Sequence, residues 1–260
     1  MKRPFVGPSV AFYAYELIRP YLIREYMNVL EVGCGLGAFL FRYAKNNSKA
    51  KITGIDISTE LIDFLNTYYK DDADKLSFTN TDFSNTNLSI AAEYDLVYSS
   101  DVIEHLTNPA GFVKNTYKAL LPNGRLIVNF PNIESHGIFH FNTVDEIKEM
   151  FKEFNKVEII SCEYKDEWKG YFALRRMYDS FKKGEFENIR AKVYESEKQG
   201  LDYFSESSSF AFSKKTHGKK LQLMLLLESL FLLWKPSVSF VKNNEGTILN
   251  KQRILIIADK

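Results

Sequence analysis

A carboxylate followed by three evenly spaced glycines is the clearest chemical signal in the sequence. The stretch NVLEVGCGLGAFL contains Glu31 and then Gly33, Gly35 and Gly37 at every second position. Glycines in this place allow a tight turn from a strand into a helix and a close approach of the backbone to a ligand. With Ala38 in the third place, the spacing also fits the fingerprint of dinucleotide cofactors. However, Glu31 would repel their pyrophosphate, whereas it would attract a ligand that carries an ammonium group.

Two more acids follow later β-rich runs. Asp56, in GIDIS, lies about 20 residues beyond the glycine turn, where a carboxylate can accept hydrogen bonds from both hydroxyls of a ribose. This role is common to dinucleotides and to other nucleoside cofactors. Asp82, in TDF, precedes Phe83, and an acid that accepts an exocyclic amino group beside an aromatic ring suits adenine. Taken alone, Asp82 is better interpreted as a turn-forming aspartate.

The elements that must position these residues alternate β-rich runs with amphipathic stretches up to about residue 162, a pattern typical of a parallel sheet with crossover helices. Strands are expected at Asn28–Val32, Lys51–Ile55, Leu76–Thr79, Asp95–Ser99, Gly124–Phe130, Lys156–Ile160 and Gln252–Ala258. Helices are expected over Gly37–Lys45, Ser58–Tyr69 and Pro109–Leu121, and after a capping-box sequence that begins at Thr143.

Composition and length indicate a globular protein with an inserted region. The 260 residues are 45% hydrophobic and carry a net charge of +1, which gives no overall field for nucleic acid. We assign residues 1–162 to a Rossmann-like core, 163–246 to an insertion and 247–260 to the final strand of the core. We expect a cytoplasmic protein, because the amino terminus lacks a signal-peptide pattern and the apolar run Leu221–Trp234 is too short to span a membrane.

Five motifs, in this order and spacing, resemble the class I S-adenosylmethionine-dependent methyltransferases. They are EVGCGLG, GIDIS, NTDFSN, YDLVYSSDVIEHL and LLPNGRLIVNFPN. The most similar group is the broad one that contains ubiquinone-biosynthesis and other small-molecule enzymes. The resemblance implies an α/β fold with a seven-stranded, mostly parallel sheet, helices on both faces and a helical insertion before the last strand. It also implies S-adenosyl-L-methionine as the cofactor, whose sulfonium and ammonium groups would explain the acid at Glu31.

The same resemblance implies a role for each residue of the expected cofactor site. It assigns Glu31, Gly33, Cys34, Gly35 and Gly37 to the methionine side, Asp56 to the ribose, Ile57, Asp82 and Phe83 to the adenine, and Ser99 and Ser100 to the sulfonium end.

A hydroxyl that accepts a methyl group at neutral pH needs a base within hydrogen-bond reach. His136 and His140, just beyond the fifth expected strand, are the first candidates, and His105 at the end of DVIEH is the next. The sequence does not choose between His136 and His140, and each histidine also fits a capping or packing role. We assemble no convincing carboxylate cluster and therefore expect no metal.

The expected acceptor is a small molecule, with no nucleic-acid partner, and a hydroxyl is the expected site of methylation. The basic and apolar segment Lys214–Trp234 could contact an anionic membrane surface, which would fit a lipid- or glycan-linked acceptor. A buried lid helix or a dimer contact is the favoured alternative. Two rival functions are an NAD(P)-dependent oxidoreductase and a non-catalytic protein that binds S-adenosylmethionine as a sensor or partner subunit. RNA methylation is a third option, which the balanced charge disfavours.

Overall fold

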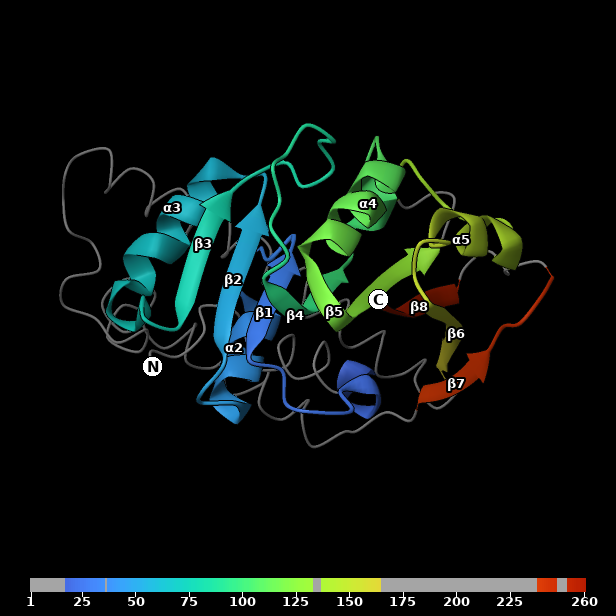
Figure 1. Ribbon diagram of the computed structural model, residues 1–260, viewed down its shortest axis with the longest axis horizontal. Helices are drawn as coiled ribbons and strands as arrows, with labels where there is room; N and C mark the ends of the chain where they lie inside the picture. The colour runs from blue at the N-terminus through green and yellow to red at the C-terminus, as the bar shows by residue number, and fades with distance from the viewer. Residues whose placement is uncertain (1–16, 36, 133–136, 165–237, 247–251) are drawn as a thin grey trace, which may run out of the picture.

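The computed structural model describes residues 17–35, 37–132, 137–164, 238–246 and 252–260 (Figure 1). These residues form an eight-stranded sheet in the order β3-β2-β1-β4-β5-β8-β6-β7. The strands are β1 (Asn28–Val32), β2 (Lys51–Asp56), β3 (Leu76–Asn80), β4 (Tyr94–Ser100), β5 (Leu120–Asn132), β6 (Lys156–Tyr164), β7 (Val238–Lys242) and β8 (Gln252–Asp259). The helices are α2 (Ala38–Asn46), α3 (Thr59–Tyr68), α4 (Pro109–Ala119) and α5 (Val144–Met150), with short 3-10 turns η1 (Arg19–Tyr21), η2 (Lys70–Asp72) and η3 (Ile103–His105).

The strand pairings confirm an α/β fold and correct the expected number of strands. The pairs from β3 through β5 are parallel, whereas β8 is antiparallel to both β5 and β6. The expected count of seven strands is wrong, because β7 pairs antiparallel with β6 and adds an eighth strand at the edge. Strand β7 lies within residues 163–246, the range assigned to the insertion. Its pairing partner is distant in sequence, so local pattern alone did not reveal it.

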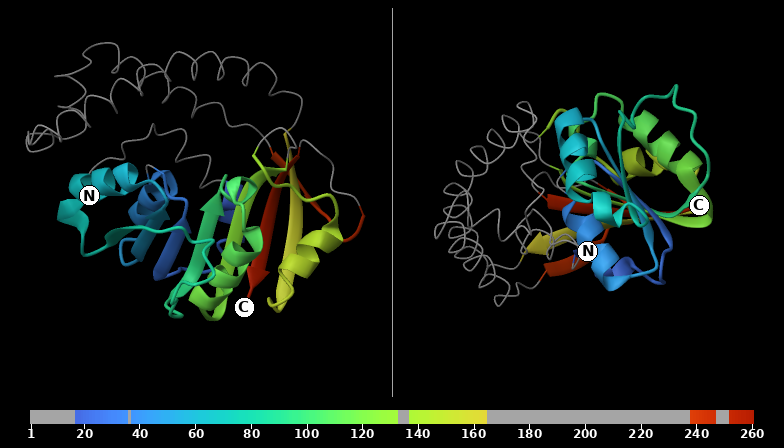
Figure 2. Two further views of the ribbon diagram at one scale, coloured as in Figure 1. Left: turned by 90° about the horizontal axis from the view of Figure 1, so that it is seen from above. Right: turned by 90° about the vertical axis from the view of Figure 1, so that its left-hand side faces the viewer.

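Helices lie on both faces of the sheet (Figure 2), and an apolar cluster packs against each face. On one face, side chains such as Val29 and Leu96 pack with those of α2 and α3. On the other, neighbours such as Leu30 and Val97 pack with those of α4 and α5. The alternation follows from the period of two in a strand, and buried strands with apolar residues on both faces are typical of sheets covered by helices on both sides.

The predicted helix caps are present. The Ser58 hydroxyl accepts a hydrogen bond from the N–H of Leu61 at 3.3 Å, and the Thr143 hydroxyl accepts one from the N–H of Glu146 at 3.2 Å. The Glu146 carboxylate completes the box one residue earlier than expected, since it accepts the N–H of Asn142 at 2.8 Å. These bonds satisfy N–H groups that have no partner within the first turn of a helix.

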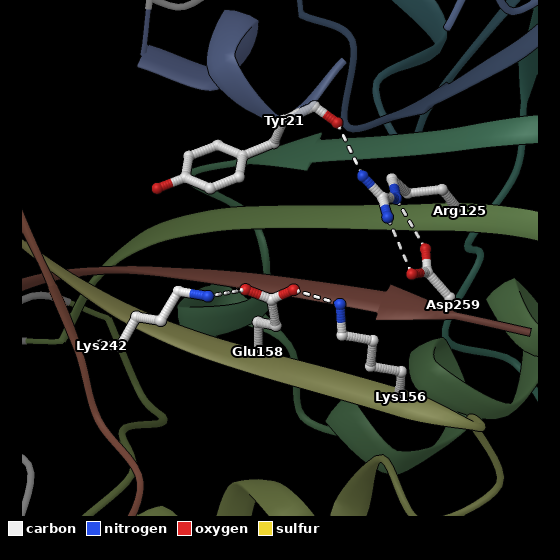
Figure 3. Close-up of polar contacts among 6 residues, drawn as sticks. All are labelled: Tyr21, Arg125, Lys156, Glu158, Lys242 and Asp259. Atoms are coloured by element: carbon white, nitrogen blue, oxygen red, sulfur yellow. Dashed lines mark hydrogen bonds and ion pairs between the residues drawn. The ribbon is translucent and has the colours of Figure 1, made fainter. Parts of the chain in front are cut away.

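Ion pairs join the strands on the antiparallel side of the sheet (Figure 3). Arg125 of β5 donates two hydrogen bonds to the Asp259 carboxylate, at 2.6 and 2.7 Å, and a third to the carbonyl of Tyr21 at 2.8 Å. Glu158 of β6 binds both Lys156 and Lys242, each at 2.6 Å, and these lysines lower the pKa of its carboxyl to about 2. Tyr21 and Lys242 are thereby tied to strands far from them in sequence. None of the helices in the described part of the chain has the length and apolar content needed to cross a membrane.

Candidate cofactor site

The glycine turn connects β1 to α2 in a backbone conformation that favours glycine. Gly33, Gly35 and Gly37 have φ angles of 72°, 50° and 73°, in the left-handed region that side chains with a Cβ disfavour. A Cβ at Gly33 would also overlap the side chain of Val102, which follows β4. The N–H groups of Gly33 and Cys34 both donate to the carbonyl of Ile55, at 2.7 and 3.0 Å. The turn is therefore fixed against the ends of β2 and β4.

Glu31 lies at the end of β1, directly before this turn, and only 5% of it is exposed. Its Oε2 accepts a hydrogen bond from the N–H of Leu40 in α2, at 3.2 Å. Burial raises the pKa of the Glu31 carboxyl well above its usual range, and the nearby charge of Asp56 raises it further, although the Leu40 N–H opposes the shift. A cationic group bound nearby would favour the charged carboxylate, so the position suits an ammonium ligand.

Asp56 ends β2 and contacts the glycine turn with its carboxylate. Its Oδ2 accepts the N–H of Gly35 and its Oδ1 accepts the N–H of Ser58, both at 2.9 Å. Each carboxylate oxygen can accept a second hydrogen bond, so both remain able to bind ribose hydroxyls. Asp56 thus links the turn that approaches the ligand with the helix that follows β2.

Gly54 is a residue of this region that the sequence analysis did not single out. A Cβ at Gly54 would approach the side chains of Leu40, Cys34 and Phe78 to between 2.8 and 2.9 Å. Contacts this short require atoms to move, so glycine is needed for α2 and the glycine turn to pack on β2. The signal was present in the quoted motif GIDIS, whose first residue is Gly54, but its role depends on neighbours from three other elements.

Ile57 and Asn80 shape the surface beside Asp56. Ile57 is 73% exposed, which leaves an apolar surface on which a flat base could pack. Asn80, at the end of β3, donates its amide hydrogens to the carbonyls of Ile57 at 2.8 Å and of Asp56 at 3.1 Å. The ends of β2 and β3 are therefore held together at the place assigned to the adenosine.

Asp82 and Phe83 follow β3 in a turn. The Asp82 Oδ1 accepts two hydrogen bonds from Ser84, from its N–H at 3.0 Å and from its hydroxyl at 2.7 Å. This is the turn-forming role, and the exposed carboxylate is still accessible to a ligand. Phe83 is 6% exposed, and its ring packs edge-on against Phe112 with 6.5 Å between centroids. The Phe83 ring therefore belongs to the core, so its contribution beside adenine would come from its backbone.

The two serines that end β4, Ser99 and Ser100, lie close to the glycine turn. The Ser99 hydroxyl is buried and donates to the carbonyl of Val32 at 3.0 Å. The Ser100 hydroxyl donates to the Asp101 carboxylate at 3.1 Å and accepts from the amide of Asn129 at 3.0 Å. Ser99 is thus fixed to the end of β1, whereas Ser100 belongs to a polar cluster that extends away from the turn.

That polar cluster includes Arg253, which sequence reasoning missed. Arg253, near the start of β8, donates to Asp101 at 2.8 Å and to the side chain of Asn129 at 3.0 Å. Asp101 has a φ of 56°, and its N–H donates to the Asn129 carbonyl at 2.8 Å. Because β8 runs antiparallel, its first residues reach the edge where the parallel strands end. No local signal connects Arg253 with Asp101, which lies 152 residues earlier.

Neither cysteine has the features of a nucleophile. Cys34 and Cys162 are both buried free thiols. Burial raises the pKa of Cys34 well above its usual range, and it raises the pKa of Cys162 to about 11. Both groups therefore stay protonated at neutral pH, and a thiol is a weaker nucleophile than a thiolate. Cys34 serves the site as a packing residue.

The structure describes two of the three candidate histidines, His105 and His140. The exposed His105 has its Nε2 3.9 Å from the carboxylate of the buried Glu104, and His140 is half-buried. The N–H groups of Ile138 and Phe139 donate to the Glu104 carbonyl at 2.7 and 3.0 Å, so the segments that carry His105 and His140 lie against each other. His136 lies outside the described residues. Within the described ranges, no three His, Cys, Asp or Glu side chains are grouped so as to hold a metal ion.

Comparisons with known proteins agree with this geometry. Residues 30–126 match the family model described as a methyltransferase domain. A ubiquinone biosynthesis O-methyltransferase of Hydrogenovibrio crunogenus is 27% identical over 109 residues, which make up 42% of this chain and 44% of the relative. A tRNA U34 carboxymethyltransferase of Nautilia profundicola is 28% identical over 129 residues, or 48% of this chain and 41% of the relative. The solved structure of phosphoethanolamine N-methyltransferase 2 from Haemonchus contortus, in complex with S-adenosyl-L-methionine, gives a TM-score of 0.54 at 17% identity and covers 96% of this chain and 52% of that chain.

Residues 30–126 match a methyltransferase domain, and the similar proteins support a class I S-adenosylmethionine-dependent methyltransferase. These findings support the predicted family and the predicted class of enzyme, with S-adenosylmethionine as the cofactor of that class. The chain spans less than half the length of the two curated relatives, and the likeness to the solved structure concerns the fold alone. The names of the relatives point to different acceptors, so they do not identify the acceptor of this chain.

Proposed function

We propose that this chain binds S-adenosyl-L-methionine and transfers its methyl group to a hydroxyl of a small molecule. The observation that carries the proposal is the buried carboxylate of Glu31 directly before the glycine turn. A carboxylate in this place favours a ligand with an ammonium group and no phosphate, because a bound cation would stabilise the charged form against the burial that raises its pKa. The same carboxylate argues against the rival NAD(P)-dependent oxidoreductase, because a pyrophosphate at the turn would meet a second negative charge.

The described residues fit the groups of this cofactor. Glu31 would face the ammonium group, Asp56 would accept the ribose hydroxyls, and the exposed Ile57 would pack on the base. When bound, the cofactor supplies a methyl group that a positively charged sulfur makes electrophilic. The task left to the protein is to align the acceptor with this methyl group and to exclude water.

A hydroxyl acceptor is supported by histidines that follow β4 and β5 in the sequence. A neutral hydroxyl is a weak nucleophile, and a histidine within hydrogen-bond reach can take its proton. His136 and His140 are the first candidates for this base and His105 is the next. A small acceptor, rather than RNA, is supported by the balanced charge of +1. A membrane contact through Lys214–Trp234 stays a prediction, because this segment lies outside the described residues. The lid function of residues 163–246 also stays a prediction, because most of this range lies outside them.

The cofactor is tested by titrating the protein with S-adenosylhomocysteine, NADH and NADPH in parallel thermal unfolding measurements. A ligand at about 100 times its Kd stabilises the native state by about 2.7 kcal/mol, which raises the unfolding temperature measurably. We expect a rise with S-adenosylhomocysteine only. A rise with NADH or NADPH instead would overturn the proposal.

The acceptor is tested by following S-adenosylhomocysteine formation with separate panels of phenols, lipid-linked sugars, amines and unmodified tRNA. We expect turnover with a hydroxyl compound, and we expect alanine at His136 or His140 to slow it by about 100-fold or more. Alanine at His217, in the predicted insertion, is the matched control and should change little. Turnover with tRNA or with amines alone would contradict the hydroxyl assignment. Tight binding of S-adenosylhomocysteine with no turnover in any panel would favour the non-catalytic alternative.

A further inference from the structure

Asn115 of α4 and Asn108, the N-cap residue directly before α4, hold three consecutive carbonyl groups of the turn that follows Asp82. Asn115 donates its amide hydrogens to the carbonyl of Phe83 at 2.9 Å and to that of Asn85 at 2.8 Å. Asn108 donates to the carbonyl between them, that of Ser84, at 3.0 Å. The backbone of residues 83–85 is therefore fixed to α4 by side chains that come from a different part of the chain.

Asn115 makes these contacts although they leave its own side-chain oxygen buried without a hydrogen bond. Its residue is fully buried, and its Oδ1 makes no hydrogen bond with any residue that the structure describes. Turning the amide over would place that oxygen against two carbonyl oxygens, so the observed orientation is the only one with attractive contacts. An unpaired buried acceptor is unfavourable, and the two donated bonds are what offsets it. An apolar residue here would leave the carbonyls of Phe83 and Asn85 without these two hydrogen bonds.

Asn108 and Gly111 bring the start of α4 against the same turn. The Oδ1 of Asn108 caps α4 by accepting the N–H of Gly111 at 3.0 Å, which leaves its amide group for Ser84. A Cβ at Gly111 would overlap the carbonyl oxygen of Ser84, so the helix start and the turn are in close contact. The two functions of Asn108 can be separated, because aspartate also caps helices but has no amide hydrogen to donate.

Because residues 83–85 are held by α4 and its N-cap residue, the carboxylate of Asp82 is fixed as well. Ser84 donates both its N–H and its hydroxyl to Asp82 Oδ1, so a Ser84 that is held by Asn108 holds this oxygen in place. The other oxygen, Oδ2, has no hydrogen-bond partner within the described part of the chain and can accept one from a ligand. Thr81 is tied to the site as well, since its N–H donates to the carbonyl of Asp56 at 3.0 Å. The orientation of the acid that would meet the adenine is thus set from α4.

We propose that Asn108 and Asn115 are positioning residues that make the site selective for a 6-aminopurine, by fixing the Asp82 carboxylate where it accepts the exocyclic amino group. This inference rests on the proposed function, in which the site binds S-adenosylmethionine. A 6-oxopurine presents an oxygen at the same position, and its approach to a fixed carboxylate is unfavourable. If the turn were free to move, the carboxylate could turn away and the discrimination would shrink.

The experiment compares S-adenosylhomocysteine with S-inosylhomocysteine, which differs from it at the 6-position of the purine. Calorimetric Kd values are measured for both ligands with the wild-type protein and with Asn115→Ala, Asn108→Asp and Asn87→Ala. Asn87 is an exposed asparagine of the same loop and provides the matched control. Because Asn115→Ala could destabilise the fold, unfolding temperatures are recorded in parallel. Asn108→Asp keeps the helix cap and supplies a second variant that stays folded.

We expect the wild-type protein and Asn87→Ala to prefer S-adenosylhomocysteine by tenfold or more. Asn115→Ala and Asn108→Asp should lose most of this preference, through weaker binding of S-adenosylhomocysteine with little change for S-inosylhomocysteine. Equal weakening of both ligands, or an unchanged preference, would show that the asparagines only stabilise the fold and would overturn the inference. Failure of the wild-type protein to bind S-adenosylhomocysteine at all would instead contradict the proposed function.

Discussion

The N–H of Gly35 donates a hydrogen bond to the carboxylate of Asp56 at 2.9 Å, although the two residues are 21 positions apart. This contact joins the two motifs that were assigned to opposite parts of the cofactor, the glycine turn and the ribose acid. Asp56 therefore has two tasks, to hold the turn and to receive the ligand. A change at Asp56 should affect both cofactor affinity and the order of the glycine turn.

Asp56→Ala should weaken the binding of S-adenosylhomocysteine by about 1–3 kcal/mol, because the ribose hydroxyls lose a charged hydrogen-bond acceptor. Calorimetric titration measures this loss directly. Asp63→Ala, which removes an exposed acid of α3, is the matched control and should bind as the wild-type protein does. An unchanged affinity in Asp56→Ala would show that the ribose is bound elsewhere.

Glu31→Gln should alter the pH dependence of the free energy of unfolding. The pKa of Glu31 is raised in the folded protein, so the folded state binds its proton more tightly than the unfolded state does. The wild-type protein should accordingly lose stability as pH rises above the ordinary value of 4.5 and through the raised pKa. Denaturant unfolding at a series of pH values should show this decline in the wild-type protein and not in Glu31→Gln.

Binding of S-adenosylhomocysteine should show the opposite trend with pH, because an ammonium group prefers the charged carboxylate. The affinity of the wild-type protein should increase as pH rises through the raised pKa of Glu31, with release of a proton on binding. Calorimetry in buffers of different ionisation enthalpy counts that proton. Equal pH profiles for Glu31→Gln and the wild-type protein would place the ammonium group away from Glu31.

Gly33→Ala should destabilise the fold by about 2 kcal/mol or more. The positive φ of 72° disfavours a side chain by about 1–2 kcal/mol, and the added Cβ also overlaps the Val102 side chain. Val102→Ala removes the overlapping methyl groups. The double variant Gly33→Ala/Val102→Ala should therefore recover the part of the lost stability that comes from the overlap, and keep the part that comes from the positive φ. Denaturant unfolding of the two single variants and the double variant measures both contributions. Equal losses with and without Val102→Ala would mean that the steric contact is unimportant.

Glu158→Gln should change the stability of the protein in acid. The lysines on either side lower the pKa of Glu158 to about 2, so the folded state keeps this carboxylate charged at a pH where the unfolded state binds a proton. The stabilisation is present above the ordinary pKa of 4.5 and is lost as pH falls to about 2. Between pH 4.5 and about pH 2, the free energy of unfolding should fall less steeply in Glu158→Gln than in the wild-type protein. Glu149→Gln, on the exposed surface of α5, serves as the control.

Much of the nucleotide-binding half could be predicted because its signals are local. The strand Asn28–Val32 was expected with the bounds that it has, and Ser58 and Thr143 cap the helices that they were expected to cap. The roles expected for Glu31 and Asp56 rest on their place at the ends of apolar runs and stay predictions. A period of two in strands, a glycine turn and a capping residue each act within a few residues, so sequence alone reveals them.

The sequence by itself determined the class of fold and the order of the acids around the expected cofactor. Only the tertiary structure decided that an eighth strand joins the edge of β6, that Arg253 lies against Asp101, and that Asn108 and Asn115 fix the turn after Asp82. Each of these depends on contact between segments that are 24 or more residues apart. Such contacts leave no periodic pattern in the chain, because the free energy that holds them comes from burial and hydrogen bonding after the strands and helices have packed.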